Sequence, residues 1–295
     1  MVARKVSEVL PTEQKLEGGG FPVRRPFPIA GMSHIDPFLL IDEMGPVDWP
    51  PGGAIGAPEH PHRGFETVTY VLQGEMEHAD SAGNSGKLSA GDVQWMTAGR
   101  GIIHSELPSE EFLRTGGVMH GFQIWVNLPA KDKMMAPRYQ DIQSSEIPEA
   151  VSDDGLVKAR VIAGECMGVS AVIDTMIPIS YIHFSLQPGG EICQKIPSGQ
   201  NCLLYCFAGA ISVGSGGSGS GGTAEQVEVG DGQLAVMGDG DSVEIAHFDG
   251  AVAEVLLLAG EPTGESVARY GPFVMNTQRE IMQAIDDYQN GTLVS

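Results

Sequence analysis

Basic residues are scarce in this chain. Lysine and arginine together number 17 against 38 aspartates and glutamates, which gives a formal net charge of −21 and a pI near 4.6. A surface with this excess of negative charge repels phosphate backbones and anionic lipid headgroups. We therefore expect no direct nucleic-acid binding and no membrane partner, whereas a basic protein partner would be attracted.

Cysteine is also scarce, with four residues that all lie in the second half of the chain. None forms a CxxC pair, and none neighbours a histidine at the spacing of a zinc finger. Strand periodicity in the run CLLYCFAG puts Cys202 and Cys206 on one face, where they are expected to pack as small buried hydrophobes. This cysteine usage suits a reducing compartment.

Long apolar runs are missing as well. No window approaches the ~18 uninterrupted apolar residues of a membrane-spanning helix. The first ten residues, MVARKVSEVL, turn polar too early to form the apolar core of a signal peptide. We expect a soluble protein of the cytoplasm, or also of the nucleus if the source is eukaryotic.

Turn-forming residues are plentiful, with 40 glycines and 19 prolines. Between them lie short runs rich in β-branched and aromatic residues, such as FETVTYVL, DVQWMT, HGFQIWVNL and NCLLYCF. This pattern predicts an all-β fold of the sandwich or barrel type. Helical periodicity is clear only over residues 277–288, which open with the capping box Thr277-x-x-Glu280, so we expect one short C-terminal α-helix.

The two halves of the chain look like copies of each other. In the first half a strand pattern ends at Gly74 and Gly91-Asp92 opens another; in the second half Gly209 and Gly230-Asp231 do the same. This repetition predicts two barrels of one type. We place an N-terminal domain at residues 1–134 and a C-terminal domain, including the terminal helix, at residues 135–295. The run GSGGSGSGG at 214–222 is expected to be a hairpin tip.

Metal-binding residue types occur in two closely spaced pairs in the first half. His60 precedes His62, and His104 precedes Glu106, each at a spacing of two. Side chains at this spacing on a β-strand project to the same face, so two antiparallel strands can converge four donors on one point. Three imidazoles and one carboxylate suit a divalent metal, and iron is favoured where octahedral positions stay open. A single HxH is common on surfaces and in cores, so the inference depends on both pairs together.

Strand parity extends this reasoning to the neighbouring strands. Counting in steps of two from His62 makes Glu66, Val68 and Tyr70 the face that points toward the metal, with Glu66 supporting the ligands. The same count gives an alternating face through Phe122 on a later strand, and His120 on that face is expected to be a hydrogen-bonded wall residue.

The second half lacks the ligands. Matching Gly209 to Gly74 places Lys195 and Pro197 where His60 and His62 stand in the first half. The matching of Gly230 to Gly91 replaces the other pair by Val243 and Ile245. We therefore expect the second barrel to be free of metal.

Long stretches of the sequence resemble the pirin family. They cover nearly the whole chain and are DPFLLIDEM, HPHRGFETVTYVLQGEMEHADSAGNSG, GDVQWMTAGRGIIHSE, HGFQIWVNLPAKDKMMAPRYQD and ARYGPFVMNTQREIMQAIDDYQNG. General cupin motifs are matched only loosely, because Glu66 follows His62 after three residues and Thr97 stands where proline is usual. That departure is itself similar to pirins.

The resemblance implies an all-β bicupin, with two jelly-roll-like cupin barrels and one non-haem iron per chain, as Fe(II) or Fe(III), in the first barrel. Other divalent metals are compatible with the same donors. Carried over residue by residue, the metal ligands fall on His60, His62, His104 and Glu106. Members of the family are described as flavonol (quercetin-type) 2,3-dioxygenases, and others as regulators that bind transcription factors or metabolic enzymes.

Two hypotheses of function follow. In the first, the protein is an oxygenase for a small aromatic substrate such as a flavonol, and Glu106 is the catalytic base. In the second, it is a non-catalytic regulator whose iron senses redox state and changes affinity for a protein partner. A sugar isomerase or storage protein of the cupin type fits the ligand set less well. Open metal positions inside an enclosed barrel favour the enzyme, because they admit a small molecule.

Overall fold

The computed structural model describes residues 1–214 and 226–295, so most of the glycine–serine run lies outside the described residues. Strands account for 57% of the residues and helices for 7%, which confirms the predicted all-β class with two cupin domains. Among the described residues, no helix is long and apolar enough to cross a membrane.

The chain forms two compact units, and each terminal segment of the chain belongs to the unit that is built mainly from the other half. The histidine unit comprises Glu13–Ser144 and Thr263–Ser295, and the second unit comprises Met1–Thr12 and Ser145–Pro262. This division differs from the boundary expected at 134/135, because the terminal helix belongs to the histidine unit and the first residues belong to the second unit. Linear repetition in the sequence cannot reveal such an exchange, since it depends on long-range strand pairing and packing.

The barrel of the histidine unit is built from two antiparallel sheets. The larger sheet has the order β12-β9-β6-β11-β4-β3-β2, and the smaller has the order β5-β10-β7-β8. The strands of the larger sheet are β2 (Glu13–Glu17), β3 (Phe21–Phe27), β4 (Phe38–Trp49), β6 (Phe65–Gln73), β9 (Val93–Thr97), β11 (Gly117–Asn127) and β12 (Arg138–Ile142). Those of the smaller sheet are β5 (Ala57–His62), β7 (Met76–Asp80), β8 (Ser85–Leu88) and β10 (Ile102–Pro108), and α1 (Glu110–Thr115) follows β10.

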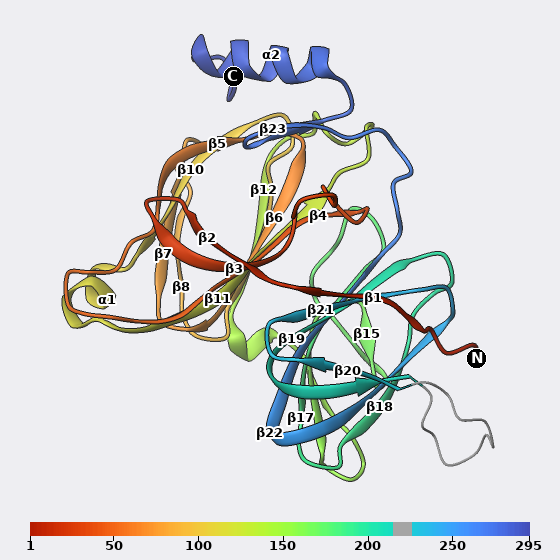
Figure 1. The fold of residues 1–295 in the computed structure, drawn as a ribbon. Coiled ribbons are helices and arrows are strands. Elements are labelled where there is room, and N and C mark those ends of the chain that lie inside the picture. The colour runs from red at the N-terminus through yellow and green to blue at the C-terminus, as the bar shows by residue number, and fades with distance from the viewer. Residues whose placement is uncertain (215–225) are drawn as a thin grey trace. The chain divides into compact units, whose positions relative to one another are not determined.

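The end of the chain closes over this barrel. A short hairpin, β23 (Ala268–Tyr270) with β24 (Phe273–Met275), leads into α2 (Gln278–Gln289), which lies at one end of the histidine unit beside β23 (Figure 1). Thr277 and Glu280 form the capping box that the sequence predicted. The inner face of α2 is buried against the hairpin through Ile281 and Ala284.

The second unit contains one nine-stranded sheet and a small hairpin. The first residues of the chain belong to it because β1 pairs with β21 in an antiparallel register. The strands of the sheet are β1 (Val6–Pro11), β13 (Glu149–Val151), β14 (Val157–Ala163), β17 (Ile179–Leu186), β18 (Glu191–Lys195), β19 (Asn201–Val213), β20 (Val227–Gly230), β21 (Gln233–Met237) and β22 (Ser242–Gly260). The hairpin joins β15 (Glu165–Cys166) to β16 (Val169–Ser170), and a 3₁₀ turn, η1 (Ser144–Glu146), precedes β13.

Side chains fill the interior of the second unit. Its core cluster contains Cys202 and Cys206 among leucine, isoleucine and valine residues, as predicted for these two cysteines. Cys166 is also buried, whereas Cys193 is exposed, and all four thiols are free. This interior is therefore a packed apolar core.

Candidate metal centre

Three histidines meet on the inner face of the smaller sheet. His60 on β5 lies directly opposite His104 on β10, and His62 lies opposite Ile102 on the same strand pair. The ring centroids of the three imidazoles are 4.5–4.9 Å apart. Their ligand atoms all lie within 4.8 Å of one another, so this group can hold a metal ion.

The surroundings keep two of these imidazoles neutral. His62 and His104 are 2% and 1% exposed. Burial lowers the pKa of His104 to about 4, with Glu106 opposing the shift and His60 adding to it. Burial also lowers the pKa of His62 well below its usual value, helped by the two neighbouring histidines. Neutral imidazoles offer lone pairs, which is the state that a metal requires.

The donor set fits a divalent cation. In the described part of the chain, neither ring nitrogen of His62 or His104 makes a hydrogen bond of normal geometry, although all four atoms are buried. Buried polar atoms without partners are costly, and a bound metal would satisfy one on each ring. Nδ1 of His60 lies 2.8 Å from the carbonyl oxygen of Pro58, so it carries the proton and leaves Nε2 as a donor to the metal.

Glu106 lies two residues beyond His104 but outside the close group of three. A register shift separates the two residues where β10 pairs with β5. The Glu106 carboxylate accepts a hydrogen bond from the Thr69 hydroxyl at 2.9 Å and from the Gln123 amide at 3.1 Å. It is 7% exposed and lines the same cavity as His60 and His62. Its coordination of the metal stays a prediction.

The parity expected for the larger sheet is wrong. Thr69 and Gln123 contact Glu106, so the odd-numbered residues of β6 and β11 face the centre. Val68 and Phe122 therefore point to the opposite face. The parity changes because the chain turns at Gly64 (φ 88°) between β5 and β6. Nearly every residue of β6 is buried, so no alternation of polarity indicates its inner face.

Two residues singled out in the sequence lie away from the centre. Glu66, which was expected to support the ligands, points to the other face of β6 and accepts a hydrogen bond from Thr97 at 2.6 Å. His120 lies 2.8 Å from the Glu43 carboxylate, as expected of a wall histidine.

A cavity of about 410 Å³ opens beside the histidines. Trp125 forms part of its wall and contacts the His62 ring edge-on, with 5.4 Å between the ring centroids. The Arg269 guanidinium lies 4.7 Å from the centre of the Trp125 ring. The cavity is also lined by apolar side chains, Phe21, Leu40, Met44 and Met76. A flat aromatic molecule can be held between such walls.

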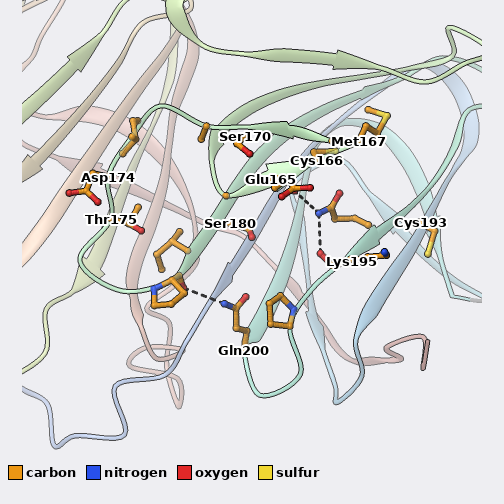
Figure 2. Close-up of a pocket in the computed structure, with 18 residues that line it drawn as sticks. Glu165, Cys166, Met167, Ser170, Asp174, Thr175, Ser180, Cys193, Lys195 and Gln200 are labelled. Carbon is orange, nitrogen blue, oxygen red and sulfur yellow. Dashed lines mark hydrogen bonds between the residues drawn. The ribbon is translucent and has the colours of Figure 1, made fainter.

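The second unit has a larger cavity, of about 820 Å³, but its chemistry is different (Figure 2). Lys195, Cys193 and Gln200 line it, together with exposed acids. By chain order and pairing, β18 corresponds to β5 and the start of β22 to β10.

This correspondence shifts the sequence-based alignment of β18 by one residue, so that Gln194 and not Lys195 takes the place of His60. Gln194 on β18 faces Val243 on β22, as His60 faces His104 in the histidine unit, and Ile192 faces Ile245. Among the described residues of the second unit, no group of histidines, cysteines and acids is arranged to hold a metal.

Models of known protein families match both halves of the chain. The family model described as Pirin matches residues 20–126, and that of the Pirin C-terminal cupin domain matches residues 181–294. Human pirin is 42% identical over 290 residues, which cover 98% of this chain and 93% of the human protein. The crystal structure of quercetin 2,3-dioxygenase from Acinetobacter baumannii superimposes with a TM-score of 0.89 at 35% identity, covering 99% of each chain. A bacterial pirin from Escherichia coli, solved with nickel(II), shares the fold at a TM-score of 0.63 and 20% identity, over 86% of this chain and 99% of that one.

Proposed function

The chain belongs to the pirin family, and from this premise we propose that it is a flavonol (quercetin-type) 2,3-dioxygenase that uses one bound iron. The observation that carries the proposal is the group of three histidines at a cavity whose lining includes Glu106, the aromatic residues Phe21 and Trp125, and both apolar and charged side chains. Relatives that bear the name quercetin 2,3-dioxygenase support the choice of substrate class.

In this proposal His60, His62, His104 and Glu106 hold the metal. Bound iron supplies Lewis-acid and one-electron chemistry toward the substrate and dioxygen. Nickel and other divalent cations suit the same donors.

The chain's own residues bind and orient the flavonol. In the proposed pose the rings of the flavonol lie against Trp125 and Phe21, and its 3-hydroxyl points to His60 and His62, which line the same cavity. Glu106 accepts the hydroxyl proton, since its carboxylate lines the same cavity as His60 and His62 and acts on the pKa of His104. The apolar side chains of the wall, Phe21, Leu40, Met44 and Met76, reduce the contact of water with the activated ring. Dioxygen then bonds to C2 and C4 of the substrate ring, and the C2–C3 and C3–C4 bonds break. C3 leaves as carbon monoxide with its own oxygen, and both atoms of dioxygen stay in the ester product.

An oxygen-electrode assay tests this function. Iron-loaded protein is expected to consume about one dioxygen per quercetin, with release of carbon monoxide and loss of the flavonol absorbance. The His104→Ala variant is expected to lose both iron and turnover, because it removes a buried donor. Iron-loaded protein that binds quercetin without consuming oxygen would contradict the enzyme function.

A regulatory function is the second candidate, favoured by the net charge of −21. A chain this acidic attracts basic protein surfaces, such as a DNA-binding domain, without binding DNA itself. Oxidation from ferrous to ferric iron would add a charge at the cavity and bias that contact. Equal affinity of the reduced and oxidised forms for each captured partner would argue against this candidate.

A further inference from the structure

A row of polar side chains crosses the larger sheet of the histidine unit beside the metal centre. Thr69 on β6 lies directly opposite Gln94 on β9 on one side and Gln123 on β11 on the other. Gln123 in turn lies opposite Asp42 on β4. Gln94 and Thr69 are each 1% exposed, and Asp42 is 5% exposed. Such a row inside a barrel is costly unless its members hydrogen-bond to one another or to a ligand.

The centre of the row holds the carboxylate of Glu106, which reaches it from the smaller sheet. The Thr69 hydroxyl lies 2.9 Å from Glu106 Oε1 and 2.8 Å from Gln123 Oε1. The Gln123 amide nitrogen lies 3.1 Å from Oε2 and 3.3 Å from Oε1 of the same carboxylate. A carboxylate only accepts hydrogen bonds, so the amide must present its NH₂ group to Glu106 and its oxygen to Thr69. The Thr69 hydroxyl carries one proton and lies near two acceptors, Glu106 Oε1 and Gln123 Oε1, so it donates to one of them at a time.

Both ends of the row are anchored. The Arg25 guanidinium donates to the two oxygens of Asp42 at 2.6 and 2.5 Å. At the other end Gln94 donates to Asp141 at 2.9 Å. Gln123 and Thr69 therefore lie between neighbours that are themselves hydrogen-bonded to other side chains.

We propose that Thr69 and Gln123 are the positioning residues of the metal centre: they hold the Glu106 carboxylate ready for coordination beside the three histidines. The inference rests on the proposed function only in treating Glu106 as a ligand. A side chain that is already oriented loses less conformational freedom when it coordinates a metal. Loss of an outer hydrogen bond to a ligand weakens metal binding about 10–100-fold.

Nickel affinity of the full-length protein tests this role, because Ni²⁺ stays divalent in air and needs no turnover. Thr69→Val and Gln123→Met are each expected to weaken Ni²⁺ binding about 10–100-fold in a chelator-competition titration. Thr69→Ser keeps the hydroxyl and is expected to restore the wild-type affinity. Thr67→Val is the matched control, because Thr67 lies on the same face of β6 and, within the described residues, makes no hydrogen bond to Glu106.

A double-mutant cycle separates positioning from a general structural effect. In a Glu106→Ala background there is no carboxylate to hold, so Thr69→Val is expected to change Ni²⁺ affinity less than about twofold. An equal loss in both backgrounds would overturn the positioning role. Wild-type Ni²⁺ affinity in both Thr69→Val and Gln123→Met would also overturn the positioning role, but it would not contradict the proposed metal centre. A wild-type protein that binds no Ni²⁺ and no iron would overturn the proposed function as well.

Discussion

Single residues decide whether each imidazole can act as a ligand. His104 is neutral because burial removes the water that would solvate its charged form, and His60 is oriented because its Nδ1 bonds to a backbone carbonyl. The residue type alone does not decide this role, because His120 carries the same ring but pairs with the Glu43 carboxylate. Ligand chemistry at this centre therefore depends on the neighbours of each histidine.

Thiol reactivity gives a prediction at the same scale. Burial raises the pKa of Cys166 and of Cys202 to about 12, so both thiols stay protonated and unreactive at pH 8. Cys193 is the one exposed thiol among the four. Iodoacetamide at pH 8 is therefore expected to add one label per folded chain, on Cys193, as read by mass spectrometry.

Cys193→Ser is expected to abolish labelling of the folded protein, and unfolding in urea should expose the remaining thiols. Rapid labelling of Cys166 or Cys202 without denaturant would show that the second unit opens far more readily than its packed core implies.

At the scale of elements, an ion pair links the C-terminal helix α2 to the end of β5, the strand that carries His60 and His62. Arg63, directly after His62, is 4% exposed and pairs with Asp287 on α2 at 2.7 Å. It also donates to the carbonyl oxygen of Arg100. A guanidinium buried to this extent needs its partners, because an unpaired buried charge is costly. The helix thus neutralises a charge next to His62.

Removal of this partner is expected to destabilise the protein. Asp287→Ala should lower the free energy of unfolding by about 1–3 kcal/mol in urea titrations at pH 7, because Arg63 loses the carboxylate with which it pairs. Asp286→Ala is the control, since Asp286 is exposed on the same helix. Equal stabilities of the two variants would mean that solvent replaces the ion pair.

The same pair predicts a pH dependence. Arg63 holds the pKa of Asp287 below its ordinary value of 3.8. A carboxyl whose pKa is lower in the folded state stabilises fully above its unfolded pKa, and this contribution is lost as the pH falls toward the folded value. The stability difference between wild type and Asp287→Ala should therefore be constant from pH 7 to about 5 and shrink below about pH 4.

At the scale of the whole molecule, the two compact units are expected to respond differently to metal. A ligand that binds only the folded state stabilises it by about 2.7 kcal/mol at a hundredfold excess over Kd. Hydrogen exchange measured with and without Ni²⁺ should therefore slow in Glu13–Ser144 and also in Thr263–Ser295, which belongs to the same unit. The segment Ser145–Pro262 should exchange at an unchanged rate.

His104→Ala is the control for this experiment and should remove the slowing in both segments of the histidine unit. A response confined to Glu13–Ser144 would indicate that α2 is not coupled to the metal centre.

Sequence alone determined the features that depend on local pattern. The all-β class followed from short β-branched runs between glycine and proline turns, the helix from its capping box, and the three histidines from spacings of two on strands. Each of these is set by residues a few positions apart, and strand or helix geometry translates such spacing directly into position.

The tertiary structure decided what depends on turns and on distant partners. Thr69 and Gln123 face Glu106 because the chain turns at Gly64 and shifts the parity of β6, and no polarity pattern on that strand reveals it. The exchange of chain ends between the units depends on β1 pairing with β21 and on α2 packing against the β23–β24 hairpin. Such contacts join residues far apart in the chain, so they produce no local pattern of residues from which the sequence could predict them.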